Sequence, residues 1–114
     1  MSTPVTTLLQ HIDQGSATFS DVLDFINARY DFTATAFDNG SVHNGAGENS
    51  GSCRVFAFAQ LNDLNAEETI KLFAEHAASV HAHPEGTDHQ NIRNFIQHGW
   101  AGIRFAGKAL SPKA

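Results

Sequence analysis

The segment from Cys53 to Leu64 constrains the fold more than any other part of the sequence, because it is apolar nearly all the way round. It reads Cys-Arg-Val-Phe-Ala-Phe-Ala-Gln-Leu-Asn-Asp-Leu, and periodicity alone cannot separate a buried helix from a buried strand in such a run. Its alanines, Gln60 and Leu61 favour a helix. We therefore predict a buried helix, with Ser50 or Ser52 as its N-cap.

Two amphipathic stripes before this segment predict two short helices. The first begins at Pro4, with Thr3 as N-cap and Gly15 as a left-handed residue after its end, and the second follows an N-cap at Thr18 or Ser20. Apolar residues recur at helical spacing, at Val5, Leu8, Leu9 and Ile12 in the first helix and at Val22, Phe25 and Ile26 in the second. Helices joined by so few residues usually pack against each other.

A hairpin and a loop are predicted between these helices and the buried segment. Asn39-Gly40 is a strong two-residue turn signal, and Ser41 to His43 is expected to return as the partner strand. The run from Asn44 to Ser52 is polar, rich in glycine and without period. We interpret it as a surface loop that is a candidate for function, because a chain of this size has no second domain to link.

Two further helices and a short strand are predicted after the buried segment. Asn65-Ala-Glu-Glu is a helix start, and this helix is expected to form a hairpin with the buried one. Thr87 and Gln90 predict a capping box for the last helix, Ile103 to Phe105 a short strand, and the tail from Lys108 is expected to fray. The inner residues are expected to be Ile70, Phe73, Ala74 and Ala77 in the first of these helices and Ile92, Phe95, Ile96 and Gly99 in the last.

Together these elements predict a single compact α+β domain over residues 1–114, mostly helical, with a small antiparallel sheet or hairpin. The 114 residues are 41% hydrophobic, which is enough to build a core without disulfides. Nine phenylalanines against one tyrosine and one tryptophan predict a core that is rich in Phe.

Charge and composition limit the classes of partner. Seven Lys and Arg residues are scattered singly among twelve Asp and Glu residues, so no basic patch marks a nucleic-acid surface. No apolar run approaches the ~18 residues of a membrane span, and the N-terminus lacks the basic and apolar regions of a secretory signal. We expect no nucleic-acid partner, no membrane insertion and no Sec export. A lone cysteine, Cys53, rules out an intramolecular disulfide and fits a reducing compartment.

Cys53 is the sharpest enzymatic signal, because it follows a Gly-Ser pair at the expected start of a buried helix. Unpaired N–H groups and the helix dipole stabilise a thiolate there. His89 or His43 would be the base, and Asp88 or Glu48 would orient the imidazole, as in a hydrolase or transferase. The alternative is that Cys53 is a small apolar core residue, as free cysteines usually are.

A metal site is a second chemical interpretation. Five potential ligands fall within nine residues, namely His81, His83, Glu85, Asp88 and His89. Their spacing matches no known ligand pattern, and the adjacent pair Asp88 and His89 would point about 100° apart on a helix. The alternative is that Asp88 or Thr87 caps the last helix while Glu85 accepts loop amides. We predict no metal ion and no cofactor.

The last helix also carries a polar face. His89, Arg93 and Gln97 share one stripe, with a flank formed by Asn91, Asn94 and His98. These side chains either order the glycine-rich loop by hydrogen bonds to its polar residues Asn44, Glu48 and Asn49, or form a surface for a ligand or partner. The candidate binding residues on the two segments are His43, Asn44, Glu48, Asn49, His83, Glu85, Asn91 and Arg93.

Several motifs resemble the HopJ type III effector family of bacterial proteins. They are Tyr30-Asp31-Phe32, Phe37 with Asn39-Gly40, His43-Asn44, Gly47-Glu48-Asn49, Gly51-Ser52-Cys53, the run from Phe56 to Leu61, the run from His83 to Phe95, and Gly99-Trp100. The family is named after proteins that pathogenic bacteria inject into plant cells, and the resemblance supplies no catalytic residues. It implies a role in virulence, and a location in the bacterial cytoplasm or, after type III secretion, in a host cell.

The leading hypothesis from the sequence is a HopJ-like protein that binds a protein or small ligand at the surface formed by Asn44 to Cys53 and His83 to Arg93. If the chain is secreted, a host protein is one expected partner. The alternative is a small enzyme with Cys53 as nucleophile. That enzyme requires a cleft that joins the two segments, with the sulfur accessible and within ~4 Å of an imidazole.

Overall fold

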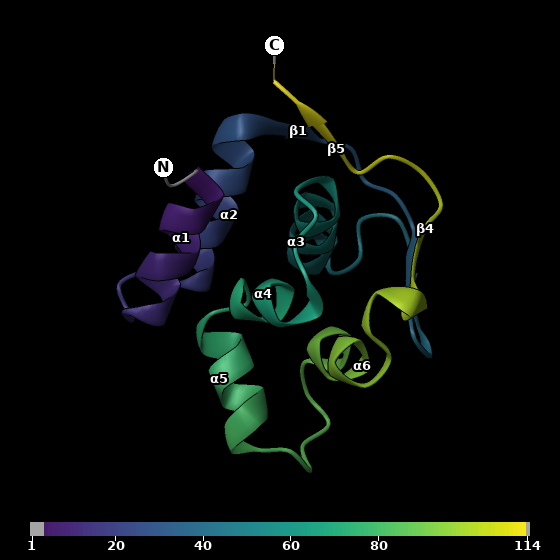
Figure 1. The fold of residues 1–114 in the computed structure, drawn as a ribbon. Helices are drawn as coiled ribbons and strands as arrows, with labels where there is room; N and C mark the ends of the chain where they lie inside the picture. The colour runs from purple at the N-terminus through teal and green to yellow at the C-terminus, as the bar shows by residue number, and fades with distance from the viewer. Residues whose placement is uncertain (1–3, 114) are drawn as a thin grey trace.

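Helix α3 (Ser50–Leu61) lies at the centre of the protein, with the other helices and the strands arranged around it (Figure 1). The computed structural model describes residues 4–113. Six residues of α3 are buried, namely Cys53, Val55, Phe56, Ala57, Phe58 and Ala59, so the prediction of a buried helix is confirmed. Its N-cap is Asn49 rather than Ser50 or Ser52.

Helices α1 (Pro4–Asp13) and α2 (Phe19–Arg29) follow each other at the start of the described chain, and α2 contacts α3 (Figure 1). A capping box starts α2, because the Thr18 hydroxyl accepts the Asp21 N–H and the Asp21 carboxylate accepts the Thr18 N–H. Gly15 is left-handed after α1, as predicted. The predicted N-cap at Thr3 lies outside the described residues.

The strands form two small antiparallel sheets. The predicted hairpin joins β2 (Phe37–Asn39) to β3 (Val42–Asn44), and β4 (Ile103–Phe105) pairs with the other side of β2. Gly40 turns the hairpin with a φ of 60°, and a side chain on it would collide with His98 of the last helix.

The second sheet joins β1 (Tyr30–Phe32) to β5 (Leu110–Pro112). The prediction that the tail from Lys108 frays was therefore wrong. Ala109 and Leu110 are buried, and Thr33 N–H donates to the Ala109 carbonyl, so long-range pairing holds the tail.

The helix predicted from Asn65 is divided in two. Asn65 caps α4 (Ala66–Lys71) in a capping box, and α5 (Glu75–Ala82) begins after Ala74, whose φ is 50°. In one continuous helix, two adjacent side chains would point about 100° apart. The break allows both Leu72 and Phe73 to enter the core, where they are 0% and 2% exposed.

The last helix, α6 (Gln90–His98), differs from its prediction at both its start and its inner face. Thr87 is not its cap, because the N-cap is His89 and the Gln90 side chain donates to the Thr87 carbonyl at 2.6 Å. Ile96, predicted inside, is 45% exposed, whereas Asn91 and Asn94 are buried. Compared with the prediction, the inner face of α6 is rotated toward Asn91 and Asn94, because these side chains find hydrogen-bond partners on the β2–β3 hairpin.

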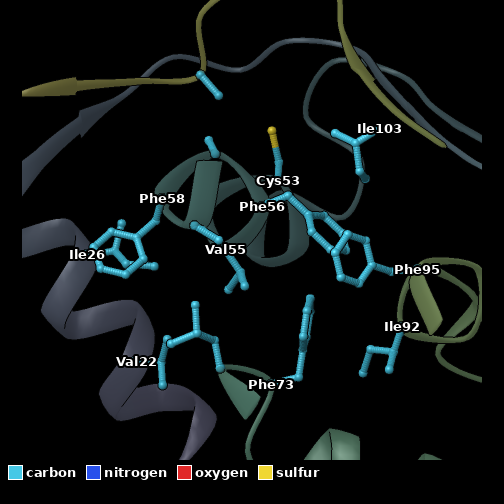
Figure 2. Close-up of a cluster of buried hydrophobic side chains, with 14 of the residues drawn as sticks. Val22, Ile26, Cys53, Val55, Phe56, Phe58, Phe73, Ile92, Phe95 and Ile103 are labelled. Carbon is cyan, nitrogen blue, oxygen red and sulfur yellow. The ribbon is translucent and has the colours of Figure 1, made fainter. Parts of the chain in front are cut away.

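The core is rich in Phe, as predicted. Phe56 packs against the rings of Phe37, Phe73 and Phe95, with centroid distances between 5.0 and 6.1 Å. Figure 2 shows Phe56, Phe73 and Phe95 in this core, together with Val22 and Ile26 from α2. The fold is a single α+β domain, mostly helical, as predicted. Among the described residues, no helix is long and apolar enough to cross a membrane.

Candidate functional site

A pocket of about 380 Å³ opens where the starts of α3 and α6 meet, and we call it the interhelix pocket. Both segments predicted to form the functional surface contribute to its wall. The lining residues are Phe19, Val42, Asn49, Gly51, Ser52, Phe73, His76, His89, Gln90, Asn91 and Ile92. The volume lies in the range of small-molecule sites in proteins, ~300–1,000 Å³.

Both helices begin with a residue in the left-handed conformation. Asn49 has φ 49° and ψ 47°, and His89 has φ 51° and ψ 48°, and neither side chain caps its helix. The first intrahelical bonds come from the N–H groups of Cys53 and Arg93. Within residues 4–113, no acceptor contacts the amides of residues 50–52 or 90–92. Six backbone donors at the two starts are therefore free.

A network of asparagine side chains explains why Asn49 does not cap α3. Its amide donates instead to Asn44 Oδ1 at 2.6 Å. Asn44 and Asn91 exchange two hydrogen bonds, at 3.1 and 3.0 Å, and Asn39 donates to the Asn91 carbonyl at 2.7 Å. The network ties the hairpin to the starts of both helices, as one of the sequence hypotheses proposed. Glu48 takes no part, since it accepts the Gly45 N–H.

Four aromatic rings line one wall of the pocket in succession. Phe73 stacks on Phe19 with centroids 5.7 Å apart, and Phe19 meets His76 edge to face at 4.9 Å. His76 then packs against His89 at 5.0 Å with a tilt of 37°. Phe19, Phe73 and His76 were not predicted as site residues, since all three lie outside the two segments that the sequence singled out.

Arg93 holds the loop before α6 rather than facing the pocket. Its guanidinium donates to the His83 carbonyl at 2.9 Å and to Asp88 Oδ1 at 2.7 Å. The hydrogen bond from Arg93 lowers the pKa of Asp88 and outweighs the opposing effect of desolvation. Asp88 Oδ2 is 3.9 Å from His89 Nε2, so its partner is Arg93 and it does not orient the imidazole.

Cys53 faces the core and does not line the pocket. It is 1% exposed, and its sulfur lies 3.9 Å from the Thr35 carbonyl, pointing toward the strands (Figure 2). Burial raises the pKa of this thiol, against smaller lowering effects of Thr35 and Arg54. The geometry therefore does not favour the low-pKa thiolate that the sequence predicts at the start of α3. The cleft that the enzyme hypothesis required exists, but the sulfur is outside it.

The other predicted site residues lie away from the pocket wall. His43 is exposed on β3, with Nδ1 at 2.6 Å from Asp38 Oδ1. His83 and Glu85 are exposed in the loop between α5 and α6. Within the part of the chain that the structure describes, no three His, Cys, Asp or Glu side chains converge on a point that could hold a metal ion.

Two comparisons identify similar proteins. A family model described as HopJ type III effector protein matches residues 5–110. The crystal structure of VPA0580, described as a protein of unknown function, is similar with a TM-score of 0.88 and 41% identity, over 99% of this chain and 97% of that chain. No curated protein matches the chain. Because the family model covers nearly its whole length, the chain belongs to the HopJ type III effector protein family.

Proposed function

We propose that this HopJ family protein binds a small ligand in the interhelix pocket. The observation that carries the proposal is the meeting of two uncapped helix starts at one cavity of about 380 Å³. Small-molecule sites typically combine an apolar or aromatic wall with a few convergent polar groups. Here the aromatic wall lies beside Asn49, Ser52 and Gln90, which supply amide and hydroxyl groups.

The pocket is a better binding site than the wider surface predicted from the sequence. Arg93, Asp88 and Glu48 are engaged by hydrogen bonds within the chain. Asn44 and Asn91 are buried in the asparagine network. Such groups are already satisfied, so they gain little from a ligand. What remains of the predicted surface is the part that lines the pocket, together with His83 and Glu85, which are exposed in the loop before α6 and lie outside the pocket wall.

A pocket-filling variant tests the proposal. Ser52→Phe places a ring in the cavity, and Ser111→Phe places the same ring on the exposed strand β5, as a matched control. The unmodified chain and both variants would be screened against a fragment library by ¹H–¹⁵N NMR. We expect ligands that shift the amide signals of Gly51 and Ser52 in the unmodified chain and in the control, and no such shifts in Ser52→Phe. Hits that map elsewhere would contradict the proposal.

We infer from the family that the chain is made in the bacterial cytoplasm and delivered to a host cell by a type III secretion system. A host protein then becomes a partner to seek. The test is a translocation reporter fused to the full chain, expressed in bacteria with and without a working type III apparatus. The expected result is a host-cell signal only with the apparatus. Equal signals, or none, would contradict delivery by this route.

A further inference from the structure

We propose that the ligand of the interhelix pocket is an organic anion, with a phosphate or carboxylate group between the starts of α3 and α6 and a planar or apolar body against the aromatic wall. This inference rests on the proposed function and names the class of its ligand. Two helix starts alone do not define a ligand. Three further features point to an anion: unpaired donors on buried residues, a pair of histidine rings, and nearby carboxylates that already have donors.

The first observation is a pair of backbone donors without acceptors on two buried residues. Asn91 and Ile92 are 6% and 3% exposed, and both line the pocket. Their N–H groups belong to the first turn of α6 and find no acceptor among residues 4–113. Buried N–H groups in native proteins are nearly always paired. Because both residues line the pocket, an oxygen atom of a ligand bound there can accept from these N–H groups.

The second observation is that a similar set of donors approaches from α3. Gly51 and Ser52 also line the pocket, their backbone amides have no acceptor in the described chain, and the Ser52 hydroxyl adds a further donor. The N-terminus of a helix carries a partial positive charge, and two such ends at one cavity favour a negative ligand group. A group with several acceptor oxygens can satisfy donors from both helices at once.

The third observation is the ring pair His76 and His89 beside these donors. An imidazole is a neutral donor that becomes a cation on protonation, so it suits an anion better than the phenyl rings of the same wall do. The nearby carboxylates already have donors. Glu75 accepts the Phe19 N–H at 2.7 Å, and Asp88 is held by Arg93. Neither fills the space between the helix starts, since neither lines the pocket.

The asparagine network holds the Asn49 side chain away from the first turn of α3, and the backbone conformation of His89 leaves α6 uncapped as well. An Asn at an N-cap ordinarily accepts a hydrogen bond from the first turn of its own helix. Asn49 donates to Asn44 instead, and its left-handed backbone turns away from the capping geometry. His89 repeats this conformation at α6. Both starts are thus held free of internal caps, so the donors are available to a ligand.

Three probes test the inference on ¹⁵N-labelled full chain: phenyl phosphate, inorganic phosphate and benzyl alcohol. The first has both the anionic group and the planar body, and each of the others lacks one. We expect phenyl phosphate to shift the amide signals of Gly51, Ser52, Asn91 and Ile92 and to bind roughly tenfold more tightly than either of the other probes, because charge-assisted hydrogen bonds and ring contacts both contribute.

A matched pair of variants separates the pocket from nonspecific attraction. His76→Gln removes a pocket imidazole on α5, and His43→Gln removes an exposed one on β3. Phenyl phosphate should bind His76→Gln several-fold more weakly and His43→Gln unchanged. Equal loss in both variants would overturn the inference.

The outcomes distinguish this inference from the proposed function. If benzyl alcohol binds in the pocket as tightly as phenyl phosphate, the anion inference fails and the pocket remains a ligand site. If phenyl phosphate shifts only signals outside the pocket, or if none of the three probes binds at millimolar concentration, the anion inference fails as well. In those two cases the fragment screen decides whether the pocket binds any ligand.

Discussion

Helices α2 and α4 begin in one way, and α3 and α6 begin in another. Thr18 and Asn65 close the first pair with complete capping boxes, and neither of these two cap residues lines the pocket. Asn49 and His89 open the second pair in a left-handed conformation without a cap, at the pocket. Left-handed backbone is unfavourable for a residue with a side chain, and a missing cap forgoes a hydrogen bond. Stability is thus lower where the pocket lies, as is common at functional sites.

The largest expected effect comes from the asparagine network, which engages Asn49 at the start of α3 and Asn91 in the first turn of α6. Asn44→Ala removes the acceptor of both Asn49 and Asn91, and we expect the free energy of unfolding to fall by about 3 kcal/mol, because two amide groups lose their buried partner. Urea denaturation measures it. The control is Asn27→Ala, an exposed residue with one hydrogen bond to Arg54, which should change stability by less than about 0.5 kcal/mol. Equal losses of unfolding free energy in the two variants would mean that the asparagine network does not stabilise the fold.

A smaller effect is expected from the capping boxes. Asn65→Ala should lower the free energy of unfolding by about 1 kcal/mol, since it removes the acceptor of the Glu68 N–H at the start of α4. Ser50→Ala, at the position predicted from the sequence to cap α3, should change stability by less than about 0.5 kcal/mol. Thermal and urea unfolding measure both. A similar loss of stability in both variants would show that Ser50 caps α3 in solution, and it would contradict the difference between capped and uncapped helix starts.

His89→Gly should stabilise the chain and weaken the site. Glycine adopts a φ of 51° without strain, which stabilises the fold. The lost ring contact with His76 and the backbone entropy of glycine oppose this effect. We expect the free energy of unfolding to rise by about 0.5 kcal/mol as the net result. The same change removes a pocket imidazole, so phenyl phosphate should bind more weakly. The control is Gln90→Gly, where the backbone is helical and glycine should destabilise. A less stable His89→Gly protein would mean that the left-handed start carries no strain.

The smallest effect on stability is expected from ionisation of Cys53, which is buried in the core next to the pocket-lining Ser52. Because burial raises the pKa of this thiol, its contribution to stability is complete below the unfolded pKa of ~8.5 and is lost as pH rises through the higher folded value. Alkylation by iodoacetamide at pH 8.5 should be slow in the native chain and fast in urea. Fast native alkylation with an apparent pKa below ~8.5 would revive Cys53 as a nucleophile.

Local signals in the sequence predicted much of the fold. The buried helix, the capping of α2 and α4, the hairpin at Asn39-Gly40 and the strand β4 each follow from a few neighbouring residues. The family was also recognisable from motifs, and the family model confirms it. The two segments named as the functional surface do meet at one pocket, although only part of each lines it.

Long-range contacts account for what the sequence did not predict. The starts of α3 and α6 were assigned to Ser and Thr caps, but Asn49 is drawn to Asn44 and neither helix has a side-chain cap. The inward rotation of α6 needs the hairpin to receive Asn91 and Asn94. The strand β5 needs β1, which is about eighty residues earlier in the chain. No local pattern encodes partners at such distances.

A crystal structure of the full chain grown with phenyl phosphate would show directly whether the anion binds between the starts of α3 and α6. We expect phosphate oxygens within ~3 Å of the backbone nitrogens of Asn91 and Ile92, with the phenyl ring against His76 and Phe19. It also predicts that Asn49 still donates to Asn44 in the complex. A phosphate bound elsewhere, or a side chain of the protein capping the first turn of α6, would contradict it.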